Sequence, residues 1–162
     1  LELAKAGKLQ NPAELERQVE RMLQDSKAAA FTRHFSSAWL RLDKLGKMPP
    51  SGGDFQFYKN LKVEPMLLKQ VTSYFEEILN TNGRISEFID SDYTYMNQDL
   101  GKWIYRREDI RGARLRKVKL DDPRRGGIFT QPGIMTATAN GVDTSPVIRG
   151  TWVLENLSLI HI

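Results

Sequence analysis

Apolar residues at helical spacing constrain the fold of this chain more than any other feature of its sequence. Pro65 suits the first turn of a helix, and Gly83 can end that helix in a left-handed conformation. The seven apolar residues between them recur at steps of one and three and form one broad face: Leu67, Leu68, Val71, Tyr74, Phe75, Ile78 and Leu79. Such a face must be buried against other elements, so we expect a mainly α-helical fold.

Shorter helices are expected on both sides of this one. Asn11 can cap a helix that Pro12 opens, and Gly46 can stop the helix after it. Residues 91–94 offer a cap for a helix whose apolar residues continue as far as Ile104. These expected helices cover residues 12–25, 27–46, 85–90 and 91–104.

The positive charge of the chain is concentrated in one segment. The whole sequence has 24 basic and 20 acidic residues, a net charge of +4. Residues 102–125 hold ten of the basic residues and four of the acidic ones, so this segment carries +6 and the rest of the chain −2. Its apolar residues follow no clean period. We expect an irregular basic segment with one short strand.

Two helix-like pieces follow the basic segment, at residues 128–138 and 146–157. Thr144 or Ser145 can cap the second piece. Pro132 leaves open whether the first piece is one unbroken helix. The expected architecture is a helical domain, then the irregular basic segment, then a C-terminal helix pair.

Composition excludes several kinds of chemistry from this chain. It contains no cysteine, which rules out disulfides, thiolate metal sites, covalent haem attachment and a cysteine nucleophile. It contains two histidines, and it has no apolar run of the roughly 18 residues that a membrane span needs. We therefore expect no metal site and no membrane span.

Both ends of the sequence have the features of a metagenomic fragment. The chain begins at Leu1 rather than Met, inside a helix-like stretch, so we expect it to be truncated. Residues 157–162 resemble the translation of an adapter used in sequencing libraries. We expect this tail to be non-native, with a natural apolar tail as the alternative.

Two C-terminal motifs carry a resemblance to a known family. They are Arg125-Gly126-Gly127-Ile128-Phe129-Thr130-Gln131 and Thr144-Ser145-Pro146-Val147-Ile148-Arg149-Gly150. With upstream motifs in the expected order, the chain resembles the paired domains of unknown function of exported planctomycete proteins. Many of those proteins carry a c-type cytochrome domain near the N-terminus. The resemblance implies an extracytoplasmic location and a haem bound in a separate domain.

We expect three parts in the chain. Residues 1–101 form an N-terminal helical module, residues 102–156 contain the basic segment and the helix-pair module, and residues 157–162 form the tail.

Candidate binding residues gather in the two C-terminal motifs. Gly126 and Gly127 precede a helix-like run whose N–H groups could bind an anion, although close backbone packing also explains glycine. Arg149 lies one turn into the last helix, where it could reach Glu155 or an external anion. No catalytic residue is identified, and the candidate set is Arg125, Gly126, Gly127, Thr130, Thr144, Ser145, Arg149 and Glu155.

Two classes of function remain open. The first is a non-catalytic module that packs against sibling domains and contacts an acidic polymer or a redox partner. The second is part of an oxidoreductase or polysaccharide-active enzyme whose site other domains complete. A deep pocket with convergent polar groups favours the enzyme, whereas the same residues used in caps and internal ion pairs favour the module. Nucleic-acid binding by the basic segment is a third and unlikely interpretation.

Overall fold

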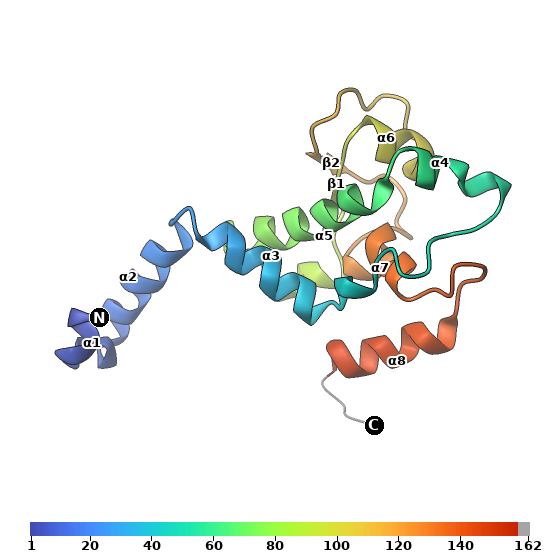
Figure 1. Cartoon of the computed structure of the whole chain (residues 1–162). Helices are drawn as coiled ribbons and strands as arrows, with labels where there is room; N and C mark the ends of the chain where they lie inside the picture. Colours follow the sequence, from blue (N-terminus) through green and yellow to red (C-terminus); the bar gives the residue numbers. More distant parts are fainter. Residues whose placement is uncertain (159–162) are drawn as a thin grey trace.

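The helix with the broad apolar face, α5 (Val63–Asn80), lies at the centre of the fold (Figure 1). The computed structural model describes residues 1–158. Within them α3, α4, α7 and the first strand all pack on α5. This arrangement confirms the mainly helical fold class. The remaining helices are α1 (Glu2–Lys5), α2 (Pro12–Leu23), α3 (Ala28–Trp39), α4 (Gln56–Asn60), α6 (Gln98–Leu100), α7 (Pro132–Ala137) and α8 (Pro146–Asn156).

The helix expected at residues 27–46 ends earlier than predicted. Helix α3 stops at Trp39 rather than near Gly46, because Arg41 adopts a left-handed conformation with φ 54°. That turn lets both Leu40 and Leu42 enter the core, whereas a continuous helix would point them to opposite sides. A short 3₁₀ turn then covers Leu42–Lys44.

At the end of α5 the left-handed residue is Asn82, with φ 50°, and not Gly83 as predicted. The Gly83 N–H instead donates to the carbonyl oxygen of Ile78 at 2.8 Å, the long bond of a Schellman-type helix end. The predicted helix at 85–90 is a 3₁₀ turn, η4 (Ile85–Phe88). Pro132 does interrupt the next piece: a 3₁₀ turn, η6 (Ile128–Thr130), precedes α7, with Gln131 extended between them.

The prediction of a helix from residues 91–94 onward is wrong at its start. Tyr93–Met96 is a strand, β1, that pairs antiparallel with β2 (Arg116–Lys119), with Tyr93 opposite Lys119. Strand β2 is the short strand expected in the basic segment. The following helix begins only after Asn97, whose side-chain oxygen accepts the Leu100 N–H at 3.0 Å. A π-helical turn, η5 (Gly101–Tyr105), continues from α6.

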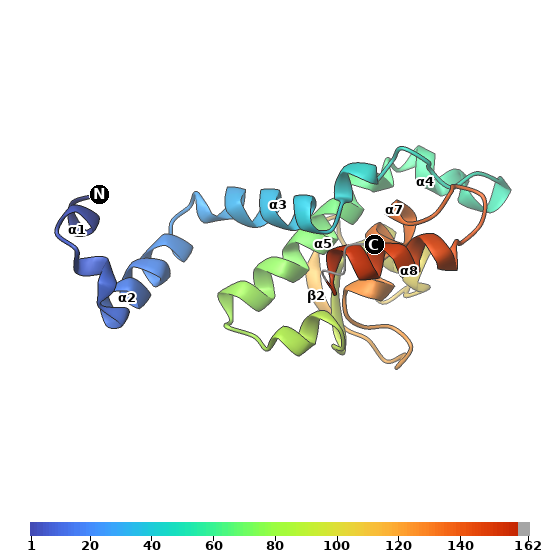
Figure 2. The same ribbon diagram turned by 90° about the horizontal axis from the view of Figure 1, so that it is seen from below.

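The N-terminal helix α2 begins as expected. The Asn11 side chain accepts the N–H groups of Ala13 at 3.0 Å and Glu14 at 3.4 Å, and Pro12 occupies the first turn. Figures 1 and 2 both show α1 and α2 projecting away from the rest of the molecule. They are joined by a 3₁₀ turn, η1 (Lys8–Gln10). At the other end of the chain, residues 159–162 of the predicted non-native tail lie outside the described residues.

The C-terminal helix pair completes the core that the N-terminal helices begin. Ile128, Ile134 and Trp152 pack in one cluster with residues of α5, β1 and the end of α3. The indole N–H of Trp152 donates to the Leu40 carbonyl oxygen at 3.2 Å, and that of Trp39 donates to the Asn156 carbonyl oxygen at 2.6 Å. The two helical parts therefore share one hydrophobic core. The boundary at residues 101/102 stays a prediction.

The loop at Gly126 and Gly127 packs so closely that only glycine fits at these two positions. A Cβ atom on Gly127 would lie 2.1 Å from the Ile89 carbonyl oxygen, and one on Gly126 would lie 2.0 Å from that of Ser91. Gly127 also has a φ of 61°, which side chains disfavour. These contacts hold the start of the C-terminal helix pair against residues 89–91, which precede β1.

We expect Gly127→Ala to lower the free energy of unfolding by about 2 kcal/mol or more, because both the clash and the positive φ oppose a Cβ atom. Urea denaturation monitored by circular dichroism measures this change. Gly150→Ala is the matched control: Gly150 lies within α8 with open space around it, so alanine there should raise stability by up to about 1 kcal/mol. Equal stability of Gly127→Ala and the parent would contradict the close approach.

One partly buried ion pair ties α5 to the sheet. The Glu77 carboxylate accepts a hydrogen bond from the Lys117 ammonium at 2.6 Å and another from the Tyr95 hydroxyl at 2.8 Å. The Lys117 hydrogen bond, followed by that of Tyr95, holds the pKa of Glu77 below its usual value. The folded protein therefore favours ionised Glu77 more than the unfolded chain does.

We expect this pair to make its whole contribution to the free energy of unfolding at pH values above the ordinary carboxyl pKa. That contribution is lost as the pH falls through the lower pKa of folded Glu77. We expect Glu77→Gln to lose about 1 kcal/mol at pH 7 and to show a smaller further loss below pH ~4 than the parent. Urea midpoints measured between pH 7 and 3 test this. Glu76→Gln controls for removal of a carboxylate from the same helix. Parallel pH profiles for Glu77→Gln and the parent would refute the linkage.

Candidate functional site

Four of the predicted binding residues line a single cleft. Its volume is about 330 Å³, and it lies between the loop before α4, helix α7 and the start of α8. Arg125, Thr130, Thr144 and Arg149 all contribute to its lining. These residues are up to 24 positions apart in the sequence, so the folding of the C-terminal helix pair brings them together.

Two loops hold one side of the cleft in place. The Ser51 N–H donates to the Gly141 carbonyl oxygen at 2.9 Å, which joins the loop before α4 to the loop before α8. Gly141 has a φ of 84°, and a Cβ atom there would come within 3.0 Å of the Pro49 carbonyl oxygen. The Asn140 side chain accepts the Asp143 N–H at 2.7 Å and so shapes the turn that follows. The position of this loop is therefore set by backbone contacts.

Most of the cleft wall is apolar. Buried Leu67 lies in the lining, and Met48, Phe55 and Met135 add partly exposed surface. The ring of Phe57, another lining residue, stacks on Trp103 with centroids 5.4 Å apart and planes 7° apart. The wall can thus accommodate an apolar group, and its two methionines can adapt to shape.

Within residues 1–158, the two arginines of the cleft have no acidic partner. An Arg149 terminal nitrogen donates to the Thr144 hydroxyl at 2.8 Å, while its buried Nε has no hydrogen-bond partner in the part of the chain that the structure describes. The Arg125 guanidinium lies 5.2 Å from the centre of the Tyr105 ring. Among residues 1–158, neither arginine forms an ion pair. Arg149 therefore does not pair with Glu155, which was one of its two predicted contacts.

Tyr58 belongs to the cleft although sequence reasoning did not single it out. Its side chain is 3% exposed, and its hydroxyl has no partner among the described residues. Burial, together with the charge of Glu64, raises the pKa of this hydroxyl, so it stays protonated near neutral pH. No periodicity or motif marks Tyr58, because it follows an irregular loop rich in proline and glycine.

Three of the four other predicted site residues, Gly126, Gly127 and Ser145, serve internal contacts. The Gly126 N–H donates to the Thr130 hydroxyl at 2.8 Å, and the Gly127 N–H donates to the Ser91 hydroxyl at 3.1 Å. The Ser145 hydroxyl accepts the Ile148 N–H and caps α8. Glu155 is exposed on α8 and is not part of the cleft lining. Binding by these four residues stays a prediction. Packing and capping account for the presence of Gly126, Gly127 and Ser145.

The arrangement combines features of both function classes. A cleft with Arg125, Thr130 and Arg149 exists, but the Thr130 hydroxyl both donates to and accepts from Gly126. Asp143 is the carboxylate among the described lining residues, and it is exposed. The cleft thus presents cationic and apolar groups, which suit binding.

Metal ligation and membrane insertion are two further properties that bear on the site. Within residues 1–158, no three His, Asp or Glu side chains come close enough together to hold a metal ion. Over the same residues, no helix has the length and apolarity needed to cross a membrane.

Comparison with known families identifies both parts of the chain. The model of PSD4, a protein of unknown function (DUF1592), matches residues 1–105. The model of PSCyt3, a protein of unknown function (DUF1588), matches residues 125–161. Searches of curated proteins and of solved structures return no match. The two families are paired domains of unknown function associated with planctomycete cytochrome proteins, which confirms the resemblance. This chain belongs to the PSD4 (DUF1592) family and carries a PSCyt3 (DUF1588) segment after it.

Proposed function

We propose that this chain is a non-catalytic interaction module of a larger exported, cytochrome-associated protein, and that α2 and α3 bind another domain of that protein. The observation that carries the proposal is that α2 is amphipathic and yet has no buried residue. The c-type haem would be held by a separate domain, since this chain has no cysteine to attach one. Its location would be extracytoplasmic.

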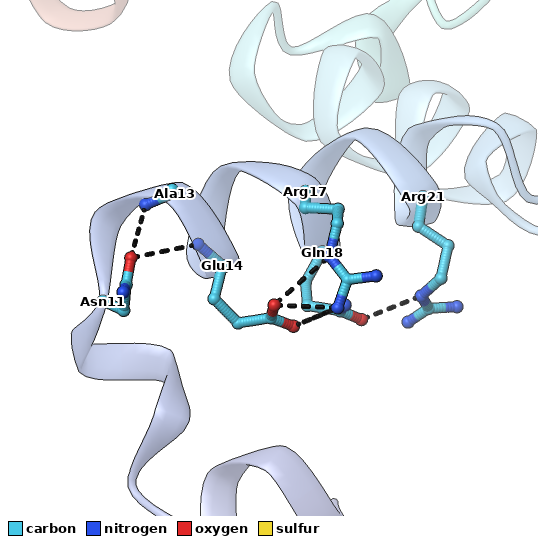
Figure 3. Close-up of polar contacts among 6 residues, drawn as sticks. All are labelled: Asn11, Ala13, Glu14, Arg17, Gln18 and Arg21. Atoms are coloured by element: carbon cyan, nitrogen blue, oxygen red, sulfur yellow. Dashed lines mark hydrogen bonds and ion pairs between the residues drawn. The ribbon is translucent and has the colours of Figure 1, made fainter.

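The apolar face of α2 is open. Leu15, Val19 and Met22 are 48%, 47% and 61% exposed. On the polar face, side chains of α2 bind one another: Glu14 pairs with Arg17 at 2.7 Å, and Gln18 accepts a hydrogen bond from Arg21 at 2.9 Å (Figure 3). A helix of this length is marginal in water without packing of its apolar face. Helix α2 therefore needs a partner on that face.

The open face continues onto α3 and from there into the core. A groove of about 500 Å³ between α2 and α3 is lined by Val19, Met22 and Phe31. Phe31 stacks on Phe35 with ring centroids 5.5 Å apart, and Phe35 contacts Trp39 at 6.0 Å. Phe31 and Phe35 are still 52% and 46% exposed. Contiguous apolar surface of this kind marks an interaction site.

A sibling domain is the occupant that the family context favours. PSD4 and PSCyt3 occur as paired domains, and here the two matched segments already pack together through Trp39 and Trp152. The groove is lined by Val19, Met22 and Phe31, with Arg21, Asp25 and Lys27 also in its lining, which suits the apolar face of another helical domain in the same polypeptide.

The basic segment supports a contact with an acidic polymer or an acidic redox partner. Arg107 pairs with Asp109 and Asp121, and Arg124 pairs with Asp122. Five other cations of this segment are exposed and form no ion pair within residues 1–158: Lys102, Arg106, Arg111, Arg114 and Arg116. Such a surface attracts polyanions in a salt-dependent manner.

We expect a photo-reactive amino acid at Met22, placed in the complete protein encoded by the gene, to cross-link to another domain of the same chain. The same amino acid at Arg17, on the polar face of α2, should give at least about tenfold less intrachain product, because it faces solvent. Mass spectrometry of the digested product identifies the attached segment. Cross-links only between two copies of the chain, or equal yields at both positions, would show that the sibling-domain assignment is wrong.

A further inference from the structure

We propose that the cleft beside Arg149 binds a small amphiphilic anion, a monocarboxylate with an apolar body. This site is separate from the α2–α3 face, so the inference goes beyond the proposed function. It rests on three features of the cleft, which are its unpaired cations, its buried unpartnered hydroxyl and its apolar wall.

The charged residues of the cleft favour an anionic ligand. Arg125 and Arg149 line it without an ion pair in the described part of the chain, and Asp143 is the acidic residue of the lining. The net charge of the lining is therefore +1. A guanidinium held partly out of water without a counter-ion is unfavourable, and a bound carboxylate would relieve that cost. One compensating charge favours a monoanion over a phosphate dianion.

Buried polar groups in the same cleft also lack partners. The Tyr58 hydroxyl and the Arg149 Nε are both inaccessible to solvent and make no hydrogen bond within residues 1–158. Such groups are uncommon in folded proteins, and a bound ligand or an ordered water is one way in which they gain a partner. Outside the cleft, the side chains of Gln70 and Gln131 also have buried atoms without a partner in residues 1–158. Tyr58 is 97% buried and keeps its proton, so it can act as a donor.

The wall of the cleft fits an apolar body attached to the anionic group. Met48, Phe57 and Met135 provide aliphatic and aromatic contact, and Leu67 and Pro132 lie buried among them. The volume of about 330 Å³ is at the lower end of small-molecule sites. A ligand that carried only charge would leave this surface exposed to water, and a purely apolar ligand would leave both arginines unpaired.

Isothermal titration with octanoate tests the proposal on the chain as it stands. We expect saturable binding with a dissociation constant below about 1 mM. Acetate, which has the charge without the apolar body, and octanol, which has the body without the charge, should each bind at least about tenfold more weakly. These comparisons need no variant, so they remain informative if a substitution perturbs folding.

Variants locate the site. Arg149→Gln should weaken octanoate binding by about tenfold or more, and Arg125→Gln by several-fold, with the circular dichroism spectrum unchanged. Arg111→Gln removes an exposed arginine outside the cleft and should leave binding unchanged. The proposal is overturned if octanoate does not saturate by about 10 mM, if octanol binds as tightly as octanoate, or if Arg111→Gln and Arg149→Gln lose affinity equally. Failure here would not affect the cross-link expected from α2.

Discussion

Burial of the broad face of α5 is the constraint on which the other elements depend. Seven of its residues are buried, and one of them is the polar Gln70 at 0% exposure. Its side-chain amide donates to the Tyr95 carbonyl oxygen at 2.7 Å and the Tyr105 hydroxyl at 2.9 Å, which fixes β1 against the helix. Elements from both halves of the chain cover this face, namely α3, α4 and β1 together with α7. The C-terminal segment is therefore part of the core, because Gly133 of α7 lies directly against Val71.

Sequence reasoning succeeded where the interactions are local. The apolar spacing of α5, the Asn11 cap of α2 and the Ser145 cap of α8 involve residues within a few positions of one another. It failed at β1, because the pairing of Tyr93 with Lys119 joins positions far apart in the chain, and a short apolar segment suits a strand as well as a helix. It also failed at Arg41, where the burial of two leucines overrides a continuous helix.

The same distinction explains how much of the cleft was predicted. Arg125, Thr130, Thr144 and Arg149 lie in two family-like motifs at expected helix starts, so the resemblance and local arguments together singled them out. Tyr58 lies in α4, and the hydrogen bond between Ser51 and Gly141 positions the irregular loop that precedes this helix. That contact joins residues 90 positions apart, and local patterns cannot indicate it. The glycines of the first motif were predicted either to bind an anion or to allow close backbone packing, and the structure shows close packing with their N–H groups in internal hydrogen bonds.

Helices α2 and α8 show the two states of an amphipathic helix in this fold. Helix α8 buries Trp152 against Leu40, and its last turn accepts the indole N–H of Trp39 at the Asn156 carbonyl oxygen. Helix α2 has a similar length but buries no residue. The row of rings from Phe31 through Phe35 to Trp39 connects the open face of α2 to the core that α8 already covers. A domain that docks on α2 would therefore extend the existing core. The stability of the two paired domains would then depend on that shared packing.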